Sequence, residues 1–289
     1  MKGLLDPKMD FVFKNIFGSE KNSKILISFL NATLKPKDLI TSVEIKNTDL
    51  NKGYIEDKFS RLDVKATTSN EEIINIEIQL KNEYNMIKRS LYYWSKLYSE
   101  QLNEGEDYSI LKRTICINIL NFKYLKTRKF HSGYRLKEIY SNEELSDVAE
   151  IHFIEIPKLE EGSDEKDMLV AWIEFLKDPE SEKVRSLELT ISEIREAKDE
   201  LIRISNDKEQ RLLYEMRAKT LKDKISALNE AERKGMQKGM QKGIKEGMQK
   251  GEKKKALEIA KSMIDMGLDK KTISKTTGLD LSEIEKLIN

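Results

Sequence analysis

The chain has 289 residues, of which 36% are charged and 38% hydrophobic, and its formal net charge at pH 7 is only +1. This length suffices for one sizeable core with an appendage, and the near-neutral total identifies no charged partner. The single cysteine, Cys116, excludes an intramolecular disulfide framework and fits a reducing interior. No apolar stretch approaches the roughly 18 residues that span a bilayer, and Asp6 and Asp10 interrupt any N-terminal signal peptide. We therefore expect a cytoplasmic protein without a membrane segment.

The first part of the chain alternates helix and strand signals. Residues 8–34 carry apolar side chains at the spacing of two helices, and residues 41–50 alternate as a strand does. The stretch RLDVKATTSNEEIINIEIQL, residues 61–80, predicts two strands joined by a polar turn. An aromatic helix over residues 86–102 and two later apolar strands, TICINILNF and EIHFIEIPKL, follow. This order predicts an α/β domain with an αβββαβ core over residues 1–160.

The rest of the chain predicts helices. Residues 161–230 carry apolar side chains three or four apart and predict a helical extension, with a break at the SND of residues 205–207. Residues 231–255 form a basic repeat with glycine at every fourth position. Each glycine costs a helix about 1 kcal/mol relative to alanine, so the repeat is a poor helix or one stabilised by a close partner. Residues 256–289 predict three short helices with helix-turn-helix rhythm, with capping or stop residues at Gly267, Asp269, Gly278 and Asp280.

Asp63, Glu77 and Gln79 are candidates for one site on the predicted hairpin. Side chains alternate faces along a strand, so Glu77 and Gln79 share one face, and pairing of the strands would bring Asp63 to Glu77. Two carboxylates with backbone carbonyls and waters suit Mg²⁺. Gln79 could orient an attacking water through its amide but lacks the positive charge of a lysine. Spacing alone favours the ordinary alternative, in which polar residues alternate on a half-exposed sheet.

Other chemistry finds less support in the sequence. His131 and His152 lie far apart without paired ligand spacing, which disfavours a histidine zinc site or a Ser-His-Asp triad. Lys14, Lys88 and Arg89 could contact phosphates, but solvated surfaces explain isolated cations better. Leu91, Trp94 and Tyr98 are expected on one stripe of the aromatic helix. Its dense aromatic residues, Tyr92, Tyr93, Trp94 and Tyr98, fit a core better than a base-stacking surface.

Several stretches together resemble one family of nucleases. An acid on one strand followed by Glu-x-Gln on the next, within this element order, is similar to the PD-(D/E)XK nuclease superfamily. More narrowly, the chain resembles the Rpn family of recombination-promoting nucleases, which are also described as transposases. The stretches that carry the resemblance are DPKMDFVFKNIFG, FLNATL, RLDVKATTSNEEIINIEIQL, RSLYYWSKLYSEQLNEGEDY and the tail KGMQKGMQKGIKEG. They cover the first 120 residues closely and the tail loosely.

The resemblance implies a restriction-endonuclease-like fold and a Mg²⁺-dependent DNA endonuclease. By this likeness Asp63 and Glu77 are the metal-binding acids, and Gln79 stands in the place of the superfamily's lysine, as is usual in this family. Asp10, on the first helix, is the acid that helps to hold the metal or its waters. The departure from lysine at Gln79 puts the rate in doubt more than the fold.

The expected partners are DNA and further copies of the chain. Residues 233–255 hold nine Lys and Arg against Glu246 and Glu252, a net charge of +7, which suits phosphate contacts as well as it suits a solvated helix. We expect the helical arm to assemble copies and to bring in DNA. One alternative is a nuclease-fold protein without turnover that acts as a DNA- or protein-binding module. Another is a sequence-specific regulator that reads a major groove through residues 256–289, which fit a packing module equally well.

Overall fold

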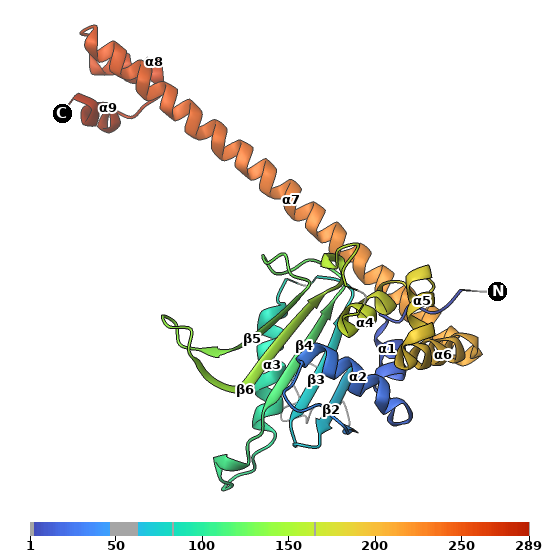
Figure 1. Ribbon diagram of the computed structural model, residues 1–289. Coiled ribbons are helices and arrows are strands. Elements are labelled where there is room, and N and C mark those ends of the chain that lie inside the picture. Colours follow the sequence, from blue (N-terminus) through green and yellow to red (C-terminus); the bar gives the residue numbers. More distant parts are fainter. Residues whose placement is uncertain (1–2, 47–62, 83, 165, 289) are drawn as a thin grey trace. The chain divides into compact units, whose positions relative to one another are not determined.

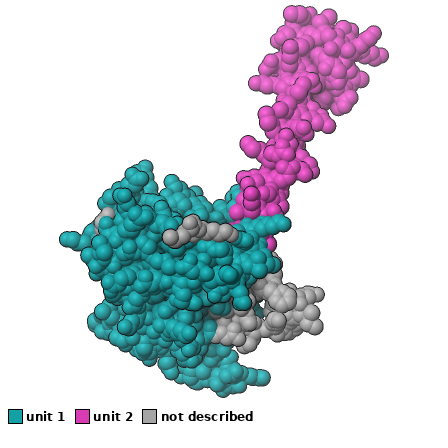
Figure 2. All heavy atoms as spheres, turned by 90° about the vertical axis from the view of Figure 1, so that its right-hand side faces the viewer, with its two compact units in different colours: residues 1–219 teal, residues 220–289 magenta. Residues whose placement is uncertain are grey.

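The computed structural model describes residues 3–46, 63–82, 84–164 and 166–288 (Figure 1). It divides into two compact units, Met1–Lys219 and Thr220–Asn289, which Figure 2 distinguishes by colour. Residues 47–62, which include the end of the first expected strand and the start of the second, lie outside the described residues. The sequence boundaries at residues 160, 230 and 255 stay predictions.

A six-stranded mixed sheet organises the first unit, in the order β1-β2-β3-β4-β6-β5. The first three strands pair antiparallel, β3, β4 and β6 run parallel, and β5 returns antiparallel along the outer edge of β6. Parallel strands need a crossover, and α3 supplies it between β3 and β4. The strands are β1 (Val43–Lys46), β2 (Val64–Thr68), β3 (Ile73–Gln79), β4 (Thr114–Leu120), β5 (His131–Lys137) and β6 (Glu144–Glu155).

Helices cover both faces of the central strands (Figure 1). All seven residues of β4 are buried and all but Thr114 and Asn118 are apolar, as expected for a strand covered on both faces. Cys116 of β4 packs against Tyr93 and Leu97 of α3 on one face. The alternate residues of β4 face α1, α2 and α4, where Trp172 packs edge-on against Phe17 and Phe29. The helices of this unit include α1 (Asp10–Phe17), α2 (Ser23–Leu34), α3 (Met86–Ser99), α4 (Met168–Lys177), α5 (Glu182–Thr190) and α6 (Ser192–Asn206).

The predicted α/β class and αβββαβ core are confirmed, with three corrections. A strand, β5, was not predicted, and β6 begins before the expected apolar run. The buried stripe of α3 consists of Met86, Ser90, Tyr93 and Leu97, so the expected stripe of Leu91, Trp94 and Tyr98 was wrong. Leu91 is 49% exposed, while Trp94 and Tyr98 are half-buried and stack on each other with ring centroids 5.0 Å apart. The break expected at residues 205–207 is confirmed, because α6 ends at Asn206 and α7 begins at Lys208.

Residues 220–289 form a helical unit with its own small core. The long helix α7 (Lys208–Asp265) contains the whole glycine repeat, and a Cβ added at each of its five repeat glycines would meet open space. Ala260 of α7 packs with Ile273 of α8 (Lys270–Thr277) and Ile284 of α9 (Leu281–Ile288). The expected cap and stop are present, since Asp269 accepts hydrogen bonds from two N–H groups of α8 and Gly278 has φ +73°. The first of the three expected short helices is instead the end of α7.

None of the described helices is long and apolar enough to cross a membrane.

Candidate active site on the β2–β3 hairpin

Asp63 is held at the entry of β2 by the neighbouring strand. The backbone N–H of Ile78 donates to Oδ2 of Asp63 at 2.7 Å. Val64 pairs with Ile76 across the hairpin, so the antiparallel register places Asp63 next to Glu77 on the same face. The sequence placed Asp63 within the strand, whereas it precedes the first residue of β2 by one position. The convergence of Asp63 and Glu77 that strand alternation predicted is present.

Glu77 lies deep in the same face, where its carboxylate has few partners. The residue is only 2% exposed, and among the described residues neither carboxylate oxygen has a hydrogen-bond partner. The nearest cation is Arg89 of α3, whose Nε lies 3.4 Å from Oε2 of Glu77 and whose guanidinium lies over the ring of Tyr93. Buried carboxylates are normally hydrogen-bonded or paired with a cation at close range. Glu77 is therefore a costly group that the fold alone does not account for.

The pKa values of both carboxyl groups are raised. Burial is the largest cause of the rise of the Asp63 pKa to about 7, and the negative charge of Asp10 adds to it, while the Ile78 N–H, Arg89 and Lys14 oppose it. Burial likewise raises the pKa of Glu77 to about 8, with Asp63 adding to the rise and Arg89 opposing it. The charge of Asp63 thus disfavours the charged form of Glu77, and the charge of Asp10 disfavours that of Asp63. Near neutral pH the pair holds protons unless a cation takes their place.

The other two predicted site residues lie at the border of this pair. Gln79 is the last residue of β3, half-buried and two positions beyond Glu77, so its side chain leaves the strand on the same face. Asp10 is the first residue of α1, and its side chain is 51% exposed. Its charge acts on Asp63, and its Oδ2 pairs with Nη1 of Arg217 at 2.5 Å. The fold thus brings Asp10 near the pair, but with an arginine already bound to it.

The donor set suits a hard cation. Among the described residues, no group of three or more His, Cys, Asp or Glu side chains is arranged to hold a metal ion. Two carboxylates, one of them without a hydrogen bond, fit an ion that keeps several waters and takes few protein ligands. The residues that could hold such an ion are Asp63 and Glu77.

Two residues of this site had only a weak signal in the sequence. Asn75, whose Oδ1 is buried without a hydrogen-bond partner among the described residues, lies two positions before Glu77 on the same face. Arg89 looked like an ordinary surface cation, yet it is the residue of α3 that approaches Glu77. The alternation that identified Glu77 and Gln79 also includes Asn75, whereas no local pattern predicts which cation of α3 turns inward.

The match to known families agrees with this geometry. Residues 7–231, more than half of the chain, match the family described as PD-(D/E)XK nuclease family transposase. The chain belongs to this family. Residues 253–288 match the family described as Rpn/YhgA-like nuclease family, C-terminal HTH domain. No curated protein and no solved structure matches the chain.

These matches confirm two expectations from the sequence. The resemblance to the Rpn nucleases holds for the α/β domain and for the tail, so a nuclease or transposase type of function is supported. The helix-turn-helix rhythm of residues 256–289 corresponds to a recognised DNA-binding type of domain.

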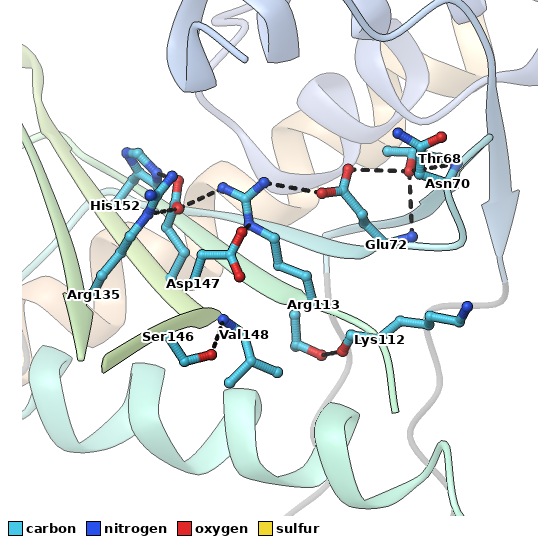
Figure 3. Close-up of polar contacts among 12 residues, drawn as sticks. Thr68, Asn70, Glu72, Lys112, Arg113, Arg135, Ser146, Asp147, Val148 and His152 are labelled. Atoms are coloured by element: carbon cyan, nitrogen blue, oxygen red, sulfur yellow. Dashed lines mark hydrogen bonds and ion pairs between the residues drawn. The ribbon is translucent and has the colours of Figure 1, made fainter. Parts of the chain in front are cut away.

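A second buried polar cluster lies at the other edge of the sheet of this nuclease domain, where β5 pairs with β6. The two histidines that are distant in the sequence meet here: Nε2 of His131 lies 2.8 Å from Nδ1 of His152, whose Nε2 lies 2.6 Å from Oε1 of Glu150. Glu150 also binds Arg113 and Arg135, and Figure 3 shows Arg113 reaching on to Glu72. The spacing of the two histidines in the sequence does not indicate this contact, and among the described residues they belong to no group of three or more side chains that could hold a metal ion.

This cluster differs from the hairpin site because its charges are satisfied. Burial disfavours a charged Glu150, but hydrogen bonds from His152, Arg113 and Arg135 outweigh burial and lower the pKa of Glu150 to about 2. Burial and the neighbouring His152 lower the pKa of His131 to about 4, so the imidazole is neutral at pH 7. We interpret the cluster as the structural tie that fixes the edge strand β5 to the sheet.

The close fit of Gly133 on the His152 ring gives a first prediction. A Cβ at Gly133 would lie 3.0 Å from Cε1 and 3.1 Å from Nδ1 of His152, and hydrogen bonds on both sides hold that ring in place. Gly133→Ala should therefore destabilise the first unit by about 1–3 kcal/mol. Urea unfolding followed by tryptophan fluorescence measures this, because both tryptophans, Trp94 and Trp172, lie in this unit.

The matched control is Gly235→Ala, where the added Cβ meets open space and the helix gains about 1 kcal/mol. This control should leave the tryptophan transition unchanged. A Gly133→Ala variant as stable as the wild type would show that the polar cluster around Glu150 does not hold β5 rigidly against β6.

The raised pKa values give a second prediction. The folded-state pKa values, about 7 for Asp63 and about 8 for Glu77, exceed the ordinary values of 3.8 and 4.5 for these side chains, so the folded state binds more protons. Their contribution to stability is complete below the unfolded pKa values and is lost as pH rises through the folded ones. Metal-free protein should lose about 2 kcal/mol of unfolding free energy between pH 6.5 and 8.5. Groups with a lowered pKa, such as His131, change the stability mainly at pH values below this range.

Urea unfolding in a chelator at several pH values measures this loss. Glu77→Gln should flatten the dependence and be more stable than the wild type at pH 8.5. The exposed Glu71→Gln, in the turn of the same hairpin, should keep the wild-type slope. An equal slope in wild type and Glu77→Gln would contradict a raised pKa at Glu77.

Proposed function

We propose that this member of the PD-(D/E)XK nuclease family is a Mg²⁺-dependent DNA endonuclease of the recombination-promoting type, which hydrolyses phosphodiester bonds. The observation that carries the proposal is the carboxylate pair on the β2–β3 hairpin, in which Asp63 is half-buried and Glu77 is buried. Glu77 is 2% exposed without a hydrogen bond among the described residues, and its pKa is raised to about 8. A fold tolerates such a buried carboxylate where a bound cation compensates its negative charge.

Each site residue has a distinct part in this proposal. Asp63 and Glu77 hold the metal ion, and the Ile78 N–H fixes the orientation of the Asp63 carboxylate. A bound Mg²⁺ supplies positive charge for the phosphate and lowers the pKa of a water. Gln79 orients the attacking water through its amide, and Asp10 supports the ion or its waters. Hydrolysis by an activated water needs no nucleophilic side chain.

The partners follow from the two family matches and from charge. The C-terminal domain, residues 253–288, would bind the DNA duplex, and the +7 stretch of α7 at residues 233–255 would add contacts to phosphates that do not depend on sequence. We further propose that α7 assembles copies of the chain and that the protein works in the cytoplasm, where Cys116 stays reduced and buried.

A second candidate function follows from one observation, the glutamine at position 79 where the superfamily carries a lysine. An amide cannot stabilise the charge of the transition state as an ammonium does, so turnover depends on the metal and on Arg89. The alternative is a nuclease-fold protein that binds DNA or protein without efficient cleavage. It predicts that DNA binding survives the loss of Glu77 and that no strand is cut.

A third prediction separates the two functions. Purified full-length protein should nick supercoiled plasmid in Mg²⁺ and not in a chelator, because the carboxylate pair lacks charge compensation without the ion. Glu77→Gln should reduce the nicking rate by at least about 100-fold, the scale of losing a group that stabilises transition-state charge. Glu71→Gln, of the same chemistry but 70% exposed, should cut at the wild-type rate. If the folded wild type binds plasmid but does not cut it in the presence of any divalent ion, the result would favour the binding module.

A further inference from the structure

The first turns of α7 are fastened to the N-terminal segment that leads into α1. Nη2 of Arg211 donates to the backbone oxygen of Gly3 at 3.1 Å and to that of Ser205 at 2.7 Å. One turn further, Tyr214 packs edge-on against Phe11, with ring centroids 6.3 Å apart. One more turn places Arg217 at α1. Residues 208–219, which we call the α7 base, thus follow α1 closely, and they belong to the same compact unit.

Arg217 makes two contacts with the start of α1. Its Nη1 lies 2.5 Å from Oδ2 of Asp10, and its guanidinium carbon lies 5.3 Å from the ring centroid of Phe11. A guanidinium over an aromatic ring and beside a carboxylate is held in orientation as well as in position. The partner of this arginine is the acid that we propose as a support of the metal site.

Asp10 therefore faces two competing demands. Helix α1, which begins at Asp10, lies in contact with β3, the strand that carries Glu77, and the negative charge of Asp10 also raises the pKa of Asp63. The Arg217 guanidinium neutralises that charge and occupies one of the two carboxylate oxygens. Two cations compete for one carboxylate, because the N–H donors of the guanidinium and a metal ion or its waters need the same lone pairs.

We propose that Arg217 is a positioning residue that acts on the carboxylate site through Asp10: by holding Asp10 it weakens cation binding, and cation binding in turn loosens the α7 base. This inference rests on the proposed function. Coupling between two events at one group is reciprocal. The free energy by which the Asp10–Arg217 ion pair weakens metal binding therefore equals the free energy by which bound metal weakens the ion pair. Both side chains are partly exposed, at 39% and 51%, which limits the effect to a few-fold.

The test is the Mg²⁺ concentration that half-saturates the full-length protein, measured by calorimetry and not by cleavage. Arg217→Gln should bind Mg²⁺ about two- to fivefold more tightly than wild type, since Asp10 regains its charge. Arg217→Lys, which keeps the charge, should stay near wild type. In an Asp10→Asn background the Arg217→Gln change should have no effect. A purely structural role of Arg217 would not produce this dependence on Asp10.

Arg203→Gln is the matched control, because this arginine of α6 pairs with Glu200 and its loss removes one positive charge from the same unit. It should leave the Mg²⁺ affinity unchanged. A second measurement tests the reciprocal effect: in wild type, saturating Mg²⁺ should raise amide hydrogen exchange across residues 208–219, and in Arg217→Gln it should not.

The possible failures are distinguishable. If wild type binds Mg²⁺, Glu77→Gln abolishes binding and Arg217→Gln changes nothing or weakens binding, the proposed function stands and this inference falls. The same holds if Arg217→Gln tightens binding equally in the Asp10→Asn background, which would reduce the effect to general charge. If folded wild type binds no divalent cation, both the proposed function and the role of Arg217 are overturned.

Discussion

The burial of two carboxyl groups side by side is the constraint on which the rest of the nuclease domain depends. Asp63 directly precedes β2 and Glu77 lies opposite it on the antiparallel strand β3; β4 pairs with the other edge of β3, and α3 approaches Glu77 through Arg89, so that Glu77 is only 2% exposed. Arg89, whose Nε lies 3.4 Å away, and the side chain of Asn75 favour its charged form but do not outweigh burial. An ordinary core would hold apolar residues here, so the fold gives up stability at the hairpin in return for a place where a cation binds strongly.

The two buried acidic clusters of the sheet show what the difference in surroundings does. Glu150 has His152 and two arginines around it, its pKa falls to about 2, and it holds the edge strand β5 in place. Glu77 is equally buried but incompletely paired, and its pKa rises to about 8. The same functional group thus serves structure where its hydrogen bonds are complete and is available for chemistry where they are not.

Much of the fold and of the candidate site could be predicted from the sequence, because the patterns that indicate them are local. Strand alternation over residues 73–80 was enough to place Glu77 and Gln79 on one face, and apolar spacing was enough to find α1 and α2. The strand β5 was not predicted, since HSGYRLK has a mostly exposed pattern and its ties come from β6. The contact between Asp10 and Arg217 joins residues 207 positions apart, and no periodicity carries such information.

The most direct test of the central claim is the number of protons that the protein releases when it binds Mg²⁺. Calorimetric titration at pH 7 in two buffers of different ionisation enthalpy gives this number without relying on cleavage. Because the pKa values of Asp63 and Glu77 lie at about 7 and about 8, we expect saturable binding with a net release of about one proton or more. Both binding and release should disappear in Glu77→Gln. Binding that releases no protons, or that persists in Glu77→Gln, would contradict a buried carboxylate pair as the metal site.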